Sequence, residues 1–144
     1  MPLYFAYGSC MNRNSLAQTV GRFSVIGPAR LNGYRLRFDR RGRPCSGAAD
    51  IARSSRSHVQ GILYAVRDFK ALDRREGAPK TYRRIQVTVR ILRHAKPYRA
   101  WSYTVVNKSK HETPPSTSYA RLVWNSSKPL SPAYRNQLKK KLHI

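Results

Sequence analysis

The sequence predicts an α+β fold, and three observations support this class. Several segments show the composition or the two-residue alternation of β-strands, and short helical segments lie among and after them. A regular alternation of strand and helix, which would indicate a doubly wound sheet, is missing. With 144 residues, of which 40% are hydrophobic, the chain can bury a core without metal or disulfide support. We therefore expect one domain that spans residues 1–144.

The charge is extreme: 29 lysine and arginine residues oppose 6 acidic ones, for a formal net charge of +23. Such a charge attracts polyanions, so non-specific association with nucleic acid is one expected partnership. The basic residues are scattered along the chain, however, which favours a solvated surface over a dedicated groove. No apolar run approaches the roughly 18 to 20 residues that cross a bilayer. We expect no membrane contact and a cytoplasmic location.

Cysteine and histidine spacing gives no sign of a metal centre or a disulfide framework. Cys10 and Cys45 lack a CxxC arrangement, and the four histidines show no metal-ligand spacing. Both cysteines are expected to be free thiols, and no metal site is predicted.

The N-terminal stretch from Tyr4 to Asn12 has the pattern of a strand, a sharp turn and a helix start. Residues 3–7 form an apolar and aromatic run, and Gly8-Ser9 can turn the backbone and leave its amides unpaired. Asn12 or Asn14 can then cap a short helix. Backbone N–H groups beside a helix start can hold an anion such as a carboxylate. An ordinary strand end is the alternative.

The remaining elements follow from local patterns. Strands are predicted at 23–26, 29–38, 46–51, 58–66, 82–92 and 98–106. Helices are predicted at 14–20, 68–76, 119–124 and 131–142, and loops at 40–44 and 108–118. Gly27-Pro28 is expected to interrupt the second strand segment. Tyr34, Leu36 and Phe38 are expected to share a buried face, and Gly61 to mark a bulge or a close crossing of strands.

Glu76 lies in the last turn of a predicted helix, an unfavourable place for a carboxylate. The helix C-terminus carries partial negative charge, which raises the proton affinity of the side chain and improves it as a general base. Arg74 and Arg75 precede it, but neighbours at these spacings are not expected to share its helix face. The alternative is an exposed glutamate that pairs with Lys80 or Arg83.

Together, several motifs resemble the γ-glutamylcyclotransferases of the AIG2-like superfamily, and they occur in the same order over nearly the whole chain. The principal ones are Tyr4–Ser9, Leu72-Asp73 with Glu76-Gly77, Tyr82, and Pro114–Ser116 with Tyr119. The resemblance implies a small mixed β-barrel with flanking short helices. It also implies cyclisation of a small-molecule γ-glutamyl amide to 5-oxoproline with release of the amine. No cofactor is expected, and a homodimer is compatible with the resemblance.

The resemblance also assigns roles to particular residues. Glu76 matches the catalytic acid/base, and the substrate-binding positions are Tyr7, Gly8, Ser9, Cys10, Tyr82 and Tyr119. The backbone amides of Tyr7, Gly8 and Ser9 match a loop that holds the substrate α-carboxylate. Cys10 departs from the family, which usually has asparagine here, so Asn12 or backbone amides must substitute for that side chain.

Two other functions are compatible with the sequence. Cys10 with His58 could form a thiol enzyme, because a cysteine at a helix N-terminus is activated. A basic module of the same fold could instead bind nucleic acid, with aromatic side chains stacking on bases. The candidate aromatic residues are Tyr98, Trp101, Tyr103 and Trp124, although aromatics at strand spacing more often belong to the core.

Overall fold

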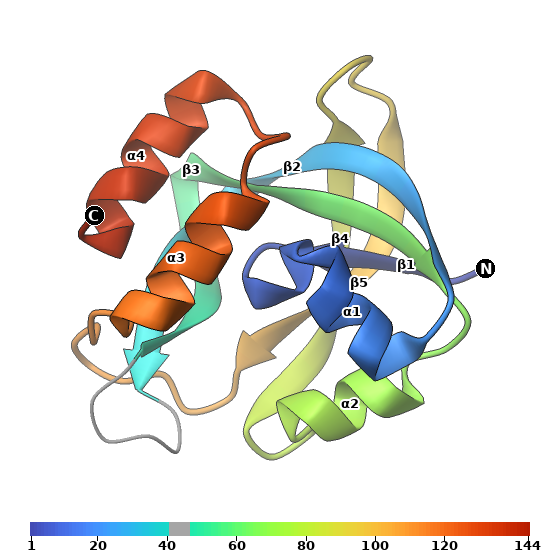
Figure 1. Cartoon of the computed structure of the whole chain (residues 1–144), viewed down its shortest axis with the longest axis horizontal. Coiled ribbons are helices and arrows are strands. Elements are labelled where there is room, and N and C mark those ends of the chain that lie inside the picture. The colour runs from blue at the N-terminus through green and yellow to red at the C-terminus, as the bar shows by residue number, and fades with distance from the viewer. Residues whose placement is uncertain (41–46) are drawn as a thin grey trace.

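The computed structural model describes residues 1–40 and 47–144, and its strands close into a barrel in the order β1-β3-β2-β4-β5. The strands are β1 Leu3–Ala6, β2 Phe23–Arg40, β3 Gly47–Val66, β4 Tyr82–Ile91 and β5 Pro97–Val105. The helices are η1 Ser9–Met11 (a 3₁₀ turn), α1 Arg13–Val20, α2 Lys70–Glu76, α3 Thr117–Ser126 and α4 Pro132–Leu142. They flank the barrel, with α3 and α4 on one side and α1 and α2 on another (Figure 1).

The barrel is mixed, as the resemblance implied. β1 pairs with β5 in parallel, and the other neighbours pair antiparallel. The predicted hairpin of residues 82–92 and 98–106 is confirmed as β4 and β5. Cys45 and most of the predicted loop at 40–44 lie outside the described residues.

The first half of the barrel departs from the predicted pattern because β2 and β3 are long and continuous. The expected interruption at Gly27-Pro28 is wrong, and so is the separation of residues 46–51 from 58–66. The ladder between β2 and β3 shifts register near Gly27 and Gly33, whose φ angles are 147° and 83°. Glycine adopts such angles without the steric cost of a Cβ atom, so these residues bend the strand instead of ending it.

The end of β2 is buried on both faces, although its alternation predicted only one. Leu36 and Phe38 are buried as expected, and Tyr34 is half-buried. The opposite face is covered as well: Arg37 is 8% exposed and Asp39 is fully buried. Arg37 donates two hydrogen bonds to the Asp39 carboxylate, at 2.9 and 2.8 Å, which satisfies the buried pair.

Helix caps follow the sequence closely. The side chains of Asn12, Ser116 and Ser131 accept hydrogen bonds from backbone N–H groups at the starts of α1, α3 and α4. Asp68 accepts one from the N–H of Lys70 at the start of α2. These bonds fix where each helix begins relative to the barrel.

Gly61 marks a close crossing, as predicted. A Cβ atom there would lie 2.2 Å from the carbonyl oxygen of Ala6, so β1 and β3 approach only because this residue has no side chain. Tyr103 is buried, and Tyr98, Trp101 and Trp124 pack against the core. The four aromatics therefore serve the core more than a surface for stacking bases.

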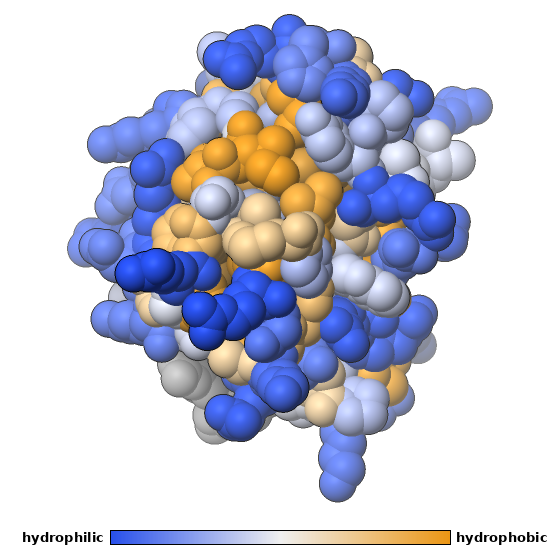
Figure 2. Space-filling view, turned by 90° about the vertical axis from the view of Figure 1, so that its right-hand side faces the viewer, coloured by the Kyte–Doolittle hydropathy of each residue, from blue (hydrophilic) through white to orange (hydrophobic). Residues whose placement is uncertain are grey.

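In the described part of the chain, no helix has the length and apolar character needed to cross a membrane. On the face shown in Figure 2, strongly hydrophilic side chains surround a band of hydrophobic ones.

Candidate active site

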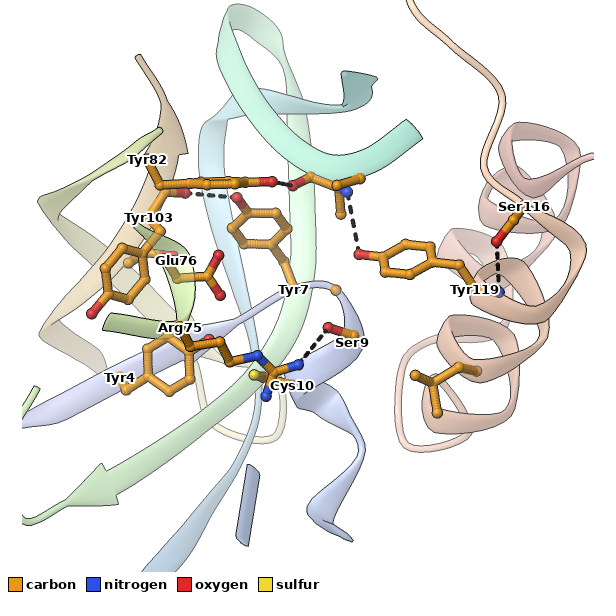
Figure 3. A pocket seen from close by; sticks show the side chains of 15 residues that line it. Tyr4, Tyr7, Ser9, Cys10, Arg75, Glu76, Tyr82, Tyr103, Ser116 and Tyr119 are labelled. Carbon is orange, nitrogen blue, oxygen red and sulfur yellow. Dashed lines mark hydrogen bonds between the residues drawn. The ribbon is translucent and has the colours of Figure 1, made fainter. Parts of the chain in front are cut away.

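A cavity of about 400 Å³ brings together residues from β1, η1, β3, α2, β4, β5 and α3. It is lined by every site residue that the sequence predicted: Tyr7, Gly8, Ser9, Cys10, Glu76, Tyr82 and Tyr119. Glu76 and Tyr7 lie on one side of this space, and Tyr119 reaches in from α3 on the other (Figure 3). The structure thus assembles the predicted residues, and their roles remain predictions.

The turn after β1 has open backbone donors. The carbonyls of Gly8 and Ser9 accept hydrogen bonds from the N–H groups three residues later, at 3.0 Å each. Within the described residues, the N–H groups of Ser9 and Cys10 have no backbone acceptor, as expected for a first helical turn. A Cβ atom on Gly8 would lie 2.9 Å from Ala49 Cβ and 3.1 Å from Tyr119 Oη, so the cavity wall requires glycine here.

Backbone groups hold three tyrosine hydroxyls in the cavity wall. Tyr7 Oη donates to the carbonyl of Tyr103 at 2.6 Å, and Tyr82 Oη donates to the carbonyl of Ala49 at 2.9 Å. The N–H of Ala49 in turn donates to Tyr119 Oη at 3.2 Å (Figure 3). Burial raises the pKa of the Tyr7 and Tyr119 phenols, so both stay neutral. The result is a rigid wall of uncharged groups.

Glu76 is the carboxylate of this cavity, and it ends α2 next to Gly77, which has a φ of 69°. Within the described residues, its carboxylate makes no hydrogen bond or ion pair, so the alternative pairing with Lys80 or Arg83 is not found. Burial raises the pKa of Glu76, and the Arg75 guanidinium lowers it. The sequence predicted the direction of the net shift from the helix C-terminus; the leading cause in the structure is burial.

Arg75 is the residue of this site that the sequence analysis assigned wrongly. It was expected to face away from Glu76, yet it lines the same cavity. Its Nη1 donates to the Ser15 carbonyl at 3.3 Å and to Thr19 Oγ1 at 2.9 Å, and Nη2 donates to Ser9 Oγ at 3.2 Å. The bond to Ser9 places the guanidinium beside the turn after β1 (Figure 3). No sequence pattern marks this, because it depends on how α2 packs against α1.

Other residues of the cavity also escaped the sequence analysis as site residues. Tyr4, Ser102, Tyr103 and Ser116 line it together with Ala48, Ala49 and Leu122. Most of them lie on β1, β3 and β5, and the pattern of a strand does not show which of its buried positions border a cavity.

The structure disfavours a thiol mechanism. Cys10 is a buried free thiol, and burial raises its pKa, which opposes formation of the thiolate. His58 lines a different cavity, where its ring lies 5.7 Å from that of Tyr134. Asn12 does not replace the family's asparagine either, because its side chain caps α1 by accepting from the N–H of Ser15 at 2.9 Å.

The described residues contain no group of three or more histidine, cysteine, aspartate or glutamate side chains that could hold a metal ion.

Comparison with known proteins places this arrangement in a family. A family model described as gamma-glutamyl cyclotransferase, AIG2-like, matches residues 4–124. The chain belongs to this family. No curated protein sequence matches the chain.

Solved structures show the same fold. A protein named gamma-glutamyl cyclotransferase has 26% identity and a TM-score of 0.87, with 96% of this chain and 86% of that one covered. The human uncharacterized protein loc79017 has 26% identity and a TM-score of 0.86, with coverages of 95% and 85%. YkqA from Bacillus subtilis has 27% identity and a TM-score of 0.85; the match covers 99% of this chain but 54% of YkqA. The fold of the family therefore extends over almost the whole chain.

Proposed function

We propose that the protein is a γ-glutamylcyclotransferase, which converts a γ-glutamyl amine or amino acid to 5-oxoproline and the free amine. The observation that carries the proposal is the pairing of two features across one cavity. Glu76 offers a half-buried carboxylate without a partner in the described residues, and the turn after β1 offers the N–H groups of Ser9 and Cys10, which have no backbone acceptor there. A base and an anion site are what this reaction requires.

The turn fixes the substrate at its α-carboxylate. Backbone N–H groups that converge at a turn bind an anion, and this contact holds the γ-glutamyl chain folded over the cavity. The folded chain brings its α-amine close to its γ-carbonyl, so that ring closure is favoured by proximity. The neutral tyrosines that line the wall exclude water without competing for the proton.

Glu76 moves the proton. The α-amine has an ordinary pKa of about 7.7 to 8.0 and is mostly protonated at neutral pH, so it cannot attack until a base removes a proton. Ionised Glu76 takes that proton, and the amine nitrogen bonds to the γ-carbonyl carbon. The bond from this carbon to the leaving nitrogen then breaks as Glu76 returns the proton to that nitrogen. The new ring nitrogen still carries a second proton, which the regenerated Glu76 carboxylate takes and passes to the departing amine, so that the amine leaves as an ammonium ion. One carboxylate serves both halves, and the raised pKa suits a group that must first accept and then donate.

Arg75 adds a positive charge beside the anion site. Three of its five N–H bonds are directed at Ser9, Ser15 and Thr19, which leaves the Nε–H and one Nη2–H for a ligand. Its position next to Ser9 supports a contact with the substrate α-carboxylate. The same charge lowers the pKa of Glu76 against the larger effect of burial and so favours the ionised form of the base.

The direct test is incubation of the protein with a panel of γ-glutamyl compounds, including γ-glutamyl amino acids, peptides and polyamines, followed by detection of 5-oxoproline. We expect the protein to release 5-oxoproline from at least one compound, and we expect the Glu76→Gln variant to lose this release. Full activity of the Glu76→Gln variant would refute the proposed mechanism. If no compound released 5-oxoproline, the fold would be the only property shared with the cyclotransferases that is supported.

The charge supports a second, non-catalytic role as a basic module that associates with polyanions. Four of the six acidic residues are held in ion pairs with basic partners, which leaves most of the 29 basic residues without a carboxylate partner in the described part of the chain. Such binding should weaken steeply with salt while turnover does not. Binding to one defined sequence that persists at about 200 mM salt would instead favour a nucleic-acid function.

A further inference from the structure

A second cavity, of about 280 Å³, lies between α4 and the β2–β3 ribbon and shares no lining residue with the candidate active site. Basic side chains from three elements line it: Arg35 of β2, Arg56 of β3 and Lys141 in the last turn of α4. None of the residues that line this cavity is acidic. Figure 1 shows α4 alongside these two strands, so the three charges are brought together by tertiary packing.

The positive charges of this cavity are poorly compensated. Arg35 lies 3.6 Å from the Glu112 carboxylate, and both side chains are about 40% exposed, an arrangement in which an ion pair contributes little. Lys141 donates to the Leu36 carbonyl. Burial lowers the pKa of Lys141, Glu112 raises it, and the Arg35 guanidinium lowers it. Arg56 has no ion pair within the described residues. An anion placed among these groups would relieve their mutual repulsion.

The rest of the wall suits a small organic body. The rings of His58 and Tyr134 lie against each other with their centroids 5.7 Å apart, and Leu36 and Leu138 add apolar surface. Ser57 and Gln137 offer hydrogen-bonding groups at the same cavity. The volume is several times the roughly 30 Å³ share of one water molecule, so there is room for more than an inorganic ion.

We propose that this cavity binds a small phosphate monoester, with the phosphate among Arg35, Arg56 and Lys141 and the organic part over Tyr134 and His58. A phosphate dianion matches a cluster of cations better than a single carboxylate does. Arginine also presents a planar pair of donors that fits two phosphate oxygens. The proposal is independent of the cyclotransferase activity.

The larger groove of about 700 Å³ between Tyr34 and β4 is lined by four basic residues, Arg53, Arg83, Arg84 and Lys108, and two of them pair with carboxylates. Lys108 pairs with Asp50 at 2.9 Å, and Arg84 lies 3.6 Å from Asp73 while stacking on two aromatic rings. The smaller cavity is the better ligand site because the His58–Tyr134 ring pair and two leucine side chains lie beside its three cations.

The proposal can be tested by calorimetric titration of the full chain. The titrants are AMP, adenosine, inorganic phosphate and a short single-stranded oligonucleotide. AMP should bind, adenosine should not, and inorganic phosphate should bind more weakly than AMP. Arg56→Leu should weaken AMP binding about tenfold or more, because it removes a charged hydrogen-bond donor. The matched variant Arg53→Leu removes the same charge from the same strand outside this cavity and should leave AMP binding within about twofold.

A second matched pair guards against a folding defect. Lys141→Met should weaken AMP binding, whereas Lys140→Met, at the neighbouring position of α4, should not; melting temperatures would show that each variant is folded. Absence of AMP binding, equal losses in the two members of a pair, or inorganic phosphate bound as tightly as AMP would overturn the proposal. Binding of the oligonucleotide without AMP would instead indicate association driven by net charge.

Discussion

The Glu76→Gln variant should lose activity and gain stability at the same time, because one half-buried carboxylate determines both properties. An amide cannot accept the α-amine proton, and general acid–base catalysis contributes about 10²- to 10⁴-fold, so kcat should fall by at least about 10². Burial raises the pKa of Glu76, which means that the fold disfavours its ionised form. Replacing the carboxylate by an amide removes this cost, so we expect a higher Tm for the variant than for the wild type at pH 7.

The gain in stability should depend on pH in a defined direction. The pKa of Glu76 is higher in the folded than in the unfolded protein, so the folded state binds more protons between the two values. Stability of the wild-type protein therefore falls as pH rises through this window, whereas glutamine has no such dependence. The difference in Tm between Glu76→Gln and the wild type should be largest at neutral pH, and it should vanish below the ordinary glutamate pKa of 4.5.

Assays of 5-oxoproline release and melting curves at pH 7 and pH 4 measure both effects, and Glu112→Gln is the matched control. Glu112, the other glutamate of the chain, accepts a hydrogen bond from the Phe38 N–H at 3.0 Å and pairs with Arg35. Its replacement should lower Tm slightly and leave activity intact. Unchanged activity of Glu76→Gln would refute its role as the base. A lower Tm at pH 7 would refute the claim that its carboxylate lacks stabilising partners.

Three further variants test other parts of the site. Arg75→Leu should lower kcat/KM for a γ-glutamyl amide about tenfold and move the acid limb of the pH profile upward. It should spare 4-aminobutanamide, which lacks the α-carboxylate, and equal losses on both substrates would exclude a carboxylate contact. In Gly8→Ala the added Cβ would lie 2.9 Å from Ala49 Cβ and 3.1 Å from Tyr119 Oη. The free energy of unfolding measured in urea should therefore fall by about 1–3 kcal/mol, and KM should rise. An unchanged KM would contradict a substrate role for the turn. Cys10→Ala should retain 5-oxoproline release, because burial keeps this thiol protonated; a loss of about 10² in kcat would revive the thiol mechanism.

Local signals in the sequence were sufficient for the second half of the fold. The alternation of residues 82–92 and 98–106 predicted β4 and β5 to within one residue at each end, because a two-residue period marks an extended segment. β4 has one buried face, whereas β5 is buried on both faces from Ser102 to Val105. Ser131 and Pro132 predicted the start of α4, since an N-cap and a first-turn proline act on their own helix alone. Neither feature depends on distant residues.

The first half of the fold needed tertiary information. Gly27-Pro28 has the composition of a chain break, yet the pairing of β2 with β3 continues past it and converts it into a register shift. Likewise, the alternation of β2 identifies the face of Leu36 and Phe38, but it cannot show that the segment after β5 covers the opposite face. That segment donates the Ser109 N–H to Asp39 at 2.9 Å, which is why Arg37 and Asp39 are buried.

The sequence by itself determined the family and the residue types of the candidate site, because the motifs around Tyr7–Ser9, Glu76 and Tyr119 are legible in order along the chain. Only the tertiary structure decided what surrounds Glu76. Its burial and the approach of Arg75 arise where α2 packs against α1 and the barrel, and both alter the pKa of the carboxylate. Proton affinity depends on solvent exclusion and on charges close in space, and neither quantity is encoded in the spacing of residues along the chain.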